Sequence, residues 1–237
     1  MATSILASAA SFKTLQTTLS SWVLTVTINN TGSEVNLFNQ LVLVEPDQVT
    51  TSVKTDASVK VIVYQSDPYQ PGDPAAKNLL ANVLWNITQL PQATIAVIDG
   101  PARGAANEFA VACDMRFASN KAVLGAPEAG ITTAAGEKYG WINKALDSSD
   151  ELYSYVKELA HRIALFPREA LVGIKASIDK RTQPSKEQIF FNANQYLEAA
   201  AHPEVRELFG KLLVLSDGLT NVEFEKNLGE EGLQLYN

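Results

Sequence analysis

Two glutamates, Glu108 and Glu128, are the residues whose type and setting could carry acid–base chemistry. Glu108 falls within about the first turn of a predicted helix, just after a bend that contains Gly100 and Gly104. Glu128 follows Pro127 after a predicted pair of short strands, so the chain can return it to the same pocket. Two carboxylates in one pocket repel each other, so one tends to hold a proton near neutral pH while the other acts as a base. Such a pair suits the addition or removal of water beside a carbonyl group.

The start of the helix that carries Glu108 predicts a place for negative charge. The first amide N–H groups of a helix have no partner within it, and they favour an anion. The small residues Gly104, Ala105 and Ala106 would let a ligand approach these amides, as in an oxyanion hole. A structural interpretation stays equally open from spacing alone. Glutamate is common in the first turn of helices because of the helix dipole, and Pro-Glu pairs are common in surface loops.

The residues before this helix predict the sheet that must position it. Residues 59–64 and 94–98 are apolar enough to form strands buried on both faces. Between them, apolar residues recur at helical spacing over 73–90. A strand, a helix and a strand at this spacing predict a βαβ unit with parallel strands. The chain therefore leaves a buried parallel strand just before the bend at Gly100.

The remaining patterns divide the chain into a mixed part and a helical part. The other predicted elements are a strand at 22–28, a helix from near Pro46, a helix at 105–113, short strands near 116–118 and 122–124, and helices from Ser148 and at 169–179, 186–200 and 204–215. Ser148 and Glu151 have the spacing of a capping box. We interpret residues 1–147 as an α/β core and 148–237 as a helical region. Residues 1–21 are expected to be a solvent-facing N-terminal segment.

Composition restricts the classes of partner. The sequence has 237 residues, of which 46% are hydrophobic, enough to bury a full core. The formal net charge is -7, and the 19 lysines and arginines are scattered, so we expect no nucleic-acid partner. Charged or polar residues interrupt each hydrophobic stretch before it reaches the length of a membrane span, so we expect no membrane partner.

The few cysteine and histidine residues argue against metal and covalent chemistry. A single cysteine, Cys113, excludes an internal disulfide framework and a multi-cysteine metal site, and we expect it in the core. His161 and His202 are distant in sequence and are expected at the surface, so no metal site is predicted. The motifs G-x-S-x-G, G-x-G-x-x-G and G-K-[ST] are absent, which argues against an ordinary serine hydrolase and against a nucleotide-binding loop. Reducing compartments suit this cysteine usage, so a cytoplasmic location is expected, with the mitochondrion or peroxisome as alternatives.

The segment 96–130 resembles the crotonase (enoyl-coenzyme A hydratase/isomerase) superfamily. The matching stretches are AVIDG at 96–100, ARGAANE at 102–108, ACDMRFA at 112–118 and GAPEAG at 125–130. Weaker similarity extends over 22–64 and from 139–143 into the helices. The resemblance implies the crotonase (ClpP/crotonase-like) fold, an α/β spiral of ββα units with a C-terminal helical region. That region would assemble trimers or pairs of trimers.

The resemblance also implies the substrate and the roles of individual residues. The substrate would be an acyl-coenzyme A thioester, with coenzyme A as part of the substrate and no separate cofactor. In hydratases of this family two backbone amides hold the thioester oxygen. The counterpart of one is Ala105, between Gly104 and Ala106, and the other would lie near Ser66. The glutamates that position water and shuttle the proton fall on Glu108 and Glu128.

The sequence departs from the family pattern in three places. The turn at 104–107 carries less glycine than is usual, so extra methyl groups and Asn107 are expected to narrow the pocket. Ser66 is followed at once by Asp67 and Pro68, where a loop of small residues is usual. Only residues 131–138 separate Gly130 from the next similar segment, where a glycine-rich loop and a helix are usual. Losing both loops is hard to reconcile with two retained glutamates, so we expect the intact protein to exceed 25.7 kDa.

These observations predict an enoyl-coenzyme A hydratase-like lyase of fatty acid metabolism. Two kinds of alternative stay open. One keeps the fold and changes the reaction to double-bond isomerisation, or to cleavage of a carbon–carbon bond by a lyase or hydrolase. The other is a non-catalytic crotonase-like protein that only binds its ligand.

Overall fold

The computed structural model describes residues 12–29, 36–37, 40–66, 69–70, 77–126 and 129–215. By its internal contacts the chain divides into two compact units, residues 1–183 and 184–237. The first unit contains the sheets and every element that leads to the candidate site. The second contains α8 (Lys186–Ala201) and α9 (Pro203–Leu215). The proposed boundary after residue 147 stays a prediction.

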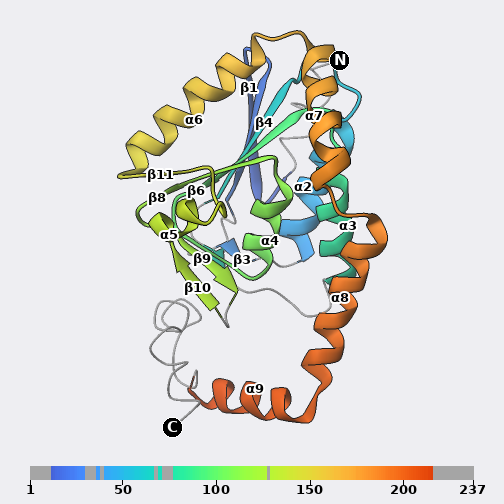
Figure 1. The fold of residues 1–237 in the computed structure, drawn as a ribbon, viewed down its shortest axis with the longest axis vertical. Coiled ribbons are helices and arrows are strands. Elements are labelled where there is room, and N and C mark those ends of the chain that lie inside the picture. The colour runs from blue at the N-terminus through green and yellow to red at the C-terminus, as the bar shows by residue number, and fades with distance from the viewer. Residues whose placement is uncertain are drawn as a thin grey trace. The chain divides into compact units, whose positions relative to one another are not determined.

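A six-stranded sheet forms the centre of the first unit, in the order β1-β2-β4-β6-β8-β11 (Figure 1). Its strands are β1 (Leu15–Ser20), β2 (Val23–Ile28), β4 (Val61–Ser66), β6 (Ala93–Ile98), β8 (Met115–Ser119) and β11 (Lys144–Leu146). β1 and β2 are antiparallel, and every other neighbouring pair is parallel. The predicted βαβ unit is confirmed as β4, α3 (Lys77–Thr88) and β6.

Helices cover both faces of this sheet, because alternate residues of each central strand point to opposite sides. Ile62 and Tyr64 of β4 join a core cluster with α2 (Gln40–Val53), α3 and α4 (Ala105–Ala112). Val61 and Val63 join a second cluster with α6 (Ser149–Ala164) on the other face (Figure 1). The prediction of strands buried on both faces is therefore confirmed. The unit is completed by α7 (Arg168–Thr182) and by α5 (Thr133–Lys138).

Two smaller sheets lie outside the central one. The first has the order β10-β9-β7 and contains β7 (Pro101–Arg103), β9 (Val123–Ala126) and β10 (Ala129–Thr132). The second pairs β3 (Asn36–Leu37) with β5 (Tyr69–Gln70). β7 pairs with β9 in parallel, so the segment between β6 and α4 is held by a strand that comes about 20 residues later along the chain.

Two sequence-based expectations about the first 50 residues were wrong. Residues 15–20 form β1 instead of a solvent-facing segment, and Ser21 and Trp22 turn the hairpin with positive φ angles of 49° and 65°. This two-residue turn lacks the Asn-Gly pattern by which such turns are usually found. Helix α2 begins at Gln40 rather than near Pro46, so Pro46 lies inside it. Burial of Val42, Leu43, Val49 and Val53 accounts for the tolerance of this proline, since packing supplies most of a helix's stability.

The predicted start of α6 is confirmed, because the Ser148 hydroxyl accepts a hydrogen bond from the Glu151 amide at 3.2 Å. Residues 73–76 of the helix predicted over 73–90 lie outside the described residues. Within the described part of the chain, no helix has the length and apolar character needed to cross a membrane.

Candidate active site

The carboxyl ends of β4 and β6 define the edge of the sheet at which the candidate site lies. Ser66, the last residue of β4, is aligned with Ile98, the last residue of β6. The chain therefore leaves both strands at one edge, and from β6 it passes through β7 to α4. Loops beyond the carboxyl ends of parallel strands are where α/β proteins commonly bind ligands. For Ser66 the structure describes the backbone, and the predicted role of the following loop lies outside the described residues.

Gly104 forms the corner between β7 and α4. It is the residue that caps α4, and its φ of 52° with ψ of -124° is a conformation that glycine adopts without strain. Its amide donates to the carbonyl of Gly125 in β9 at 3.0 Å, and its carbonyl accepts the amide of Glu108 at 3.0 Å. The corner is therefore fixed on one side to β9 and on the other to the first turn of α4.

The first turn of α4 contains the other residues predicted for anion binding. Ala105 and Ala106 are partly buried and pack against the main core cluster. Both precede Glu108, whose amide makes the hydrogen bond to Gly104 that begins the helix. Their amides therefore belong to the set that a helix leaves without internal acceptors. The structure brings Gly104, Ala105, Ala106 and Glu108 together within one turn, as the sequence predicted.

Glu108 has a carboxyl that is partly removed from water. The residue as a whole is exposed, yet the surrounding protein raises the pKa of its carboxyl above the ordinary value by desolvation. A carboxyl of this kind keeps its proton to higher pH than a free glutamate does. This is the direction of shift that favours a carboxyl acting as a general acid.

Glu128 lies outside the described residues, and the structure describes the strands on either side of it. Gly125 of β9, which accepts the Gly104 amide, precedes Glu128 by three residues. Ala129 of β10 follows it and pairs with Ala126 of β9. The strands that enter and leave this position are thus attached to the corner where α4 begins.

Aromatic and thiol groups anchor the buried side of α4. Phe109 is buried and meets the ring of Tyr64 edge-on, with 5.2 Å between ring centroids. The Tyr64 hydroxyl shares a hydrogen bond of 2.9 Å with Thr50 of α2. Cys113, at the end of α4, is buried as predicted, and burial raises the pKa of its thiol to about 12. Such a thiol stays protonated and serves packing, because the thiolate is the nucleophile.

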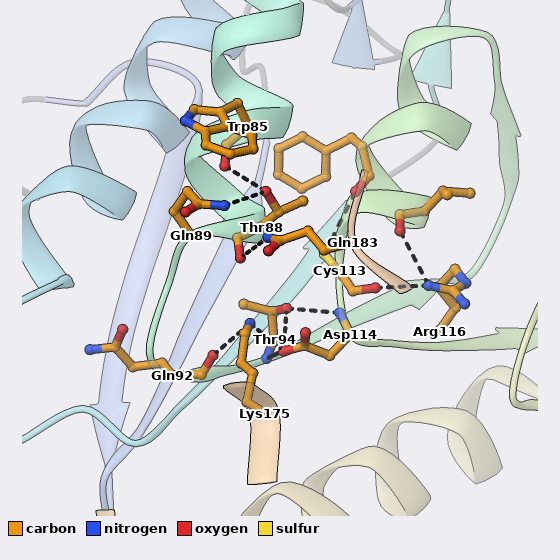
Figure 2. A network of polar contacts seen from close by, with 12 residues as sticks. Trp85, Thr88, Gln89, Gln92, Thr94, Cys113, Asp114, Arg116, Lys175 and Gln183 are labelled. Carbon is orange, nitrogen blue, oxygen red and sulfur yellow. Dashed lines mark hydrogen bonds and ion pairs between the residues drawn. The ribbon is translucent and has the colours of Figure 1, made fainter. Parts of the chain in front are cut away.

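A polar network beneath α4 gives Asp114 and Arg116 separate sets of partners. In Figure 2, Asp114 accepts the Thr94 amide and hydroxyl at 2.8 and 2.9 Å and the Lys175 ammonium at 2.8 Å. Arg116 donates to the carbonyl of Cys113 at 2.8 Å and to that of Val111 at 3.4 Å. Asp114 thus attaches α7 to the sheet, and Arg116 holds the carbonyl end of α4.

Asn107 was expected to narrow the pocket, and the sequence did not predict which residue it contacts. Asn107 is buried, and its side-chain oxygen accepts the indole N–H of Trp141 at 2.9 Å. The two residues are 34 positions apart. Only the similarity of 139–143 to the family pointed to this segment. No group of three or more metal-ligating side chains occurs among the described residues.

Part of this chain is similar in sequence to known proteins of one family. Residues 72–145 match the family model described as enoyl-CoA hydratase/isomerase. The fatty acid oxidation complex subunit alpha of Pseudomonas putida (strain GB-1) is 35% identical over 115 residues, which are 41% of this chain and 16% of that protein. YngF of Bacillus subtilis, named as an enoyl-CoA hydratase/isomerase, is 51% identical over 47 residues, which are 20% of this chain and 18% of that protein. The matched segment thus spans less than a fifth of the length of these relatives.

Solved structures share the fold of most of this chain. A crystal structure of an enoyl-CoA hydratase from Streptomyces avermitilis has a TM-score of 0.82 at 24% identity, covering 92% of this chain and 97% of that one. One of an enoyl-CoA hydratase/isomerase from Xanthobacter autotrophicus Py2 has a TM-score of 0.74 at 17% identity, covering 88% and 95%. The protein therefore has the crotonase fold. The similarity to the enoyl-CoA hydratase/isomerase family lies in the segment 72–145, which contains α3, α4 and β9.

Proposed function

We propose that the protein is an enoyl-CoA hydratase-like enzyme that adds water to, or removes it from, an acyl-coenzyme A thioester. One observation carries the proposal: the hydrogen bond of 3.0 Å from the Gly104 amide to the Gly125 carbonyl. It joins the start of the helix that bears Glu108 to the strand that leads to Glu128. Two acids and a set of helix amides would then face one ligand.

The amide of Ala105 would stabilise the charge that develops during the reaction. When the oxygen of water bonds to the β-carbon of a conjugated thioester, the electrons of the double bond move toward the thioester oxygen. A helix N-terminus favours this negative charge, and Gly104, Ala105 and Ala106 carry no side chain that would keep the ligand away. A second amide would come from the segment after Ser66, at the same edge of the sheet.

Glu108 and Glu128 would move the protons of the reaction. Water loses a proton as it attacks, and the α-carbon gains one as the enolate collapses, so no net acid or base is consumed. The raised pKa of the Glu108 carboxyl supports its part in this exchange. Glu128 is its proposed partner because β9 and β10, which flank it, are attached to the same corner.

The reaction is tested by product analysis with the intact protein. A panel of enoyl-coenzyme A thioesters of different chain length is incubated with the enzyme, and hydration is followed by loss of the conjugated absorbance and by mass. We expect products heavier than the substrate by one water. A product of unchanged mass with a moved double bond would favour the isomerase, and a shorter acyl chain would favour the carbon–carbon lyase or hydrolase. Thioester binding without any product would favour the non-catalytic alternative.

We propose further that the protein forms homotrimers or pairs of trimers. The support comes from apolar side chains on the first unit that are open to solvent: Leu165 and Phe166 after α6, and Ile174 and Ile178 on α7, each more than half exposed. Apolar groups gathered on one region commonly mark contacts between proteins. The cytoplasmic location, with the mitochondrion or peroxisome as alternatives, stays a prediction.

A further inference from the structure

Both ends of α4 are connected to the segment that contains Trp141. At the first turn, the Trp141 indole N–H donates to the side-chain oxygen of Asn107 at 2.9 Å. At the last turn, the Arg116 guanidinium donates to the Cys113 carbonyl at 2.8 Å and also to the Trp141 carbonyl at 2.8 Å. Trp141 is therefore hydrogen-bonded to the first turn of the helix that bears Glu108 directly, and to its last turn through Arg116.

The backbone of Trp141 is itself fixed. Its amide donates to the carbonyl of Gly136 at 2.7 Å, and the next residue, Ile142, is buried with 2% exposure. Asn143 then exchanges two hydrogen bonds of 2.8 Å with the backbone of Arg116. A side chain attached to so constrained a backbone can hold its partner in one place.

Asn107 connects the fixed backbone of Trp141 to the first turn of α4. It is 8% exposed, and it lies between Ala106, whose amide belongs to the first turn, and Glu108. Moving its side chain would move the backbone on either side. Displacements of about 1 Å at a catalytic group can lower turnover by roughly 100-fold.

We propose that Trp141 is a positioning residue for the reaction, and that it acts through Asn107 to hold the first-turn amides of α4 and Glu108 in their working geometry. This inference rests on the proposed function. In this proposal Trp141 does not contact the substrate. The Asn107 side chain acts by binding Trp141 within the protein, and not by contacting the ligand in the pocket.

The test combines two variants that break the hydrogen bond with one that keeps it. Trp141→Phe removes the donor and Asn107→Leu removes the acceptor, whereas Asn107→Asp keeps an accepting oxygen. Trp22→Phe is the matched control, because Trp22 lies in the turn just before β2, at the end of the sheet opposite to Ser66 and Ile98. Circular dichroism and thermal unfolding of each full-length variant establish that it is folded.

The first measurement is hydrogen exchange at the Glu108 amide, whose hydrogen bond to Gly104 reports on the first turn. We expect exchange to become roughly tenfold faster in Trp141→Phe and Asn107→Leu, because local opening is easier once a constraint is lost. The double variant should be no faster than either single one. Asn107→Asp and Trp22→Phe should exchange like the wild type. Wild-type exchange in Trp141→Phe, or additive effects in the double variant, would overturn the inference.

The second measurement is steady-state hydration of the best enoyl-coenzyme A in the panel. We expect kcat to fall by about tenfold in Trp141→Phe and Asn107→Leu while KM changes by less than about twofold, since transition-state contacts are lost and ground-state binding is kept. If the wild type is active and Trp141→Phe is equally active, the result would contradict the inference about Trp141 but not the proposed function. An inert wild type would contradict the proposed function, and the exchange measurement would still decide whether Trp141 fixes the first turn.

Discussion

The ammonium group of Lys175 lies 2.8 Å from the carboxylate of Asp114 and joins α7 to the start of β8 (Figure 2). It also donates to the carbonyl of Gln92 at 3.2 Å. None of the residues of α7 is buried. The helix is therefore attached to the sheet through polar contacts, with Gln183 adding a hydrogen bond of 2.6 Å to the Thr88 carbonyl.

Replacing Lys175 by methionine should therefore destabilise the protein. The Lys175 side chain is 10% exposed, and its removal leaves Asp114 and the Gln92 carbonyl short of a donor. We expect a loss of about 1–3 kcal/mol in the free energy of unfolding, measured by urea denaturation. Lys211→Met is the control, because Lys211 pairs with Glu207 at 3.1 Å on the surface with both side chains more than half exposed. Such pairs contribute little, so equal losses in the two variants would contradict this account of α7.

Two glycine-to-alanine variants should change stability in opposite directions. Gly104 has a φ of 52° and a ψ of -124°, which an alanine adopts only with strain, so Gly104→Ala should cost about 1–3 kcal/mol and lower turnover. Gly173 lies inside α7, and beyond the backbone of its own helix no atom lies within 4 Å of the place that an alanine methyl group would take, so Gly173→Ala should gain about 0.4–1 kcal/mol. Thermal unfolding and hydration rates measure both effects. A neutral Gly104→Ala would show that the corner before α4 is not constrained as described.

The pKa of Glu108 predicts how stability depends on pH. Because the folded-state pKa lies above the ordinary 4.5, the folded protein holds this proton over a pH range in which the unfolded chain has released it. Relative to Glu108→Gln, the wild type should lose stability as pH rises from 4.5 through the raised pKa, and the difference should then stay constant. Unfolding midpoints of both proteins across this range provide the measurement. If the wild type instead becomes more stable relative to Glu108→Gln as pH rises, the folded-state pKa of Glu108 is lowered and not raised.

The exposed apolar residues of α7 predict self-association. Ile174 and Ile178 are 60% and 56% exposed, so replacing both by serine should shift the protein toward the monomer in light scattering. Leu41→Ser on α2, where the side chain is 41% exposed, should leave the assembly unchanged. A wild-type protein that is monomeric at all concentrations would rule out the homotrimer.

The sequence predicted the elements whose signals are local. β4 and β6 follow from continuous apolar runs, α6 from the Ser148 cap, and the first turn of α4 from small residues before Glu108. It failed at Pro46, where buried neighbours outweigh the preference of proline for a helix start. In each successful case the deciding residues lie within a few positions of one another.

The contacts that shape the candidate site could not be predicted, because they join residues far apart along the chain. Gly104 and Gly125 are connected only once β7 pairs with β9, and Trp141 reaches Asn107 across 34 positions. Asp114 pairs with a lysine of α7, 61 positions away, rather than with the nearby Arg116. A single sequence gives the residue types at these positions but not which of these residues contact each other in the folded protein.

The most direct test of the proposed function is hydration of an enoyl-coenzyme A by Glu108→Gln and Glu128→Gln beside the wild type. The control is Glu158→Gln, an exposed residue of α6. Because general acid–base groups contribute about 100- to 10,000-fold, we predict that each site variant loses at least about 100-fold in turnover while remaining folded, and that the control is unchanged. Turnover at the wild-type rate in both site variants would contradict the assignment of these two glutamates as the acid–base pair.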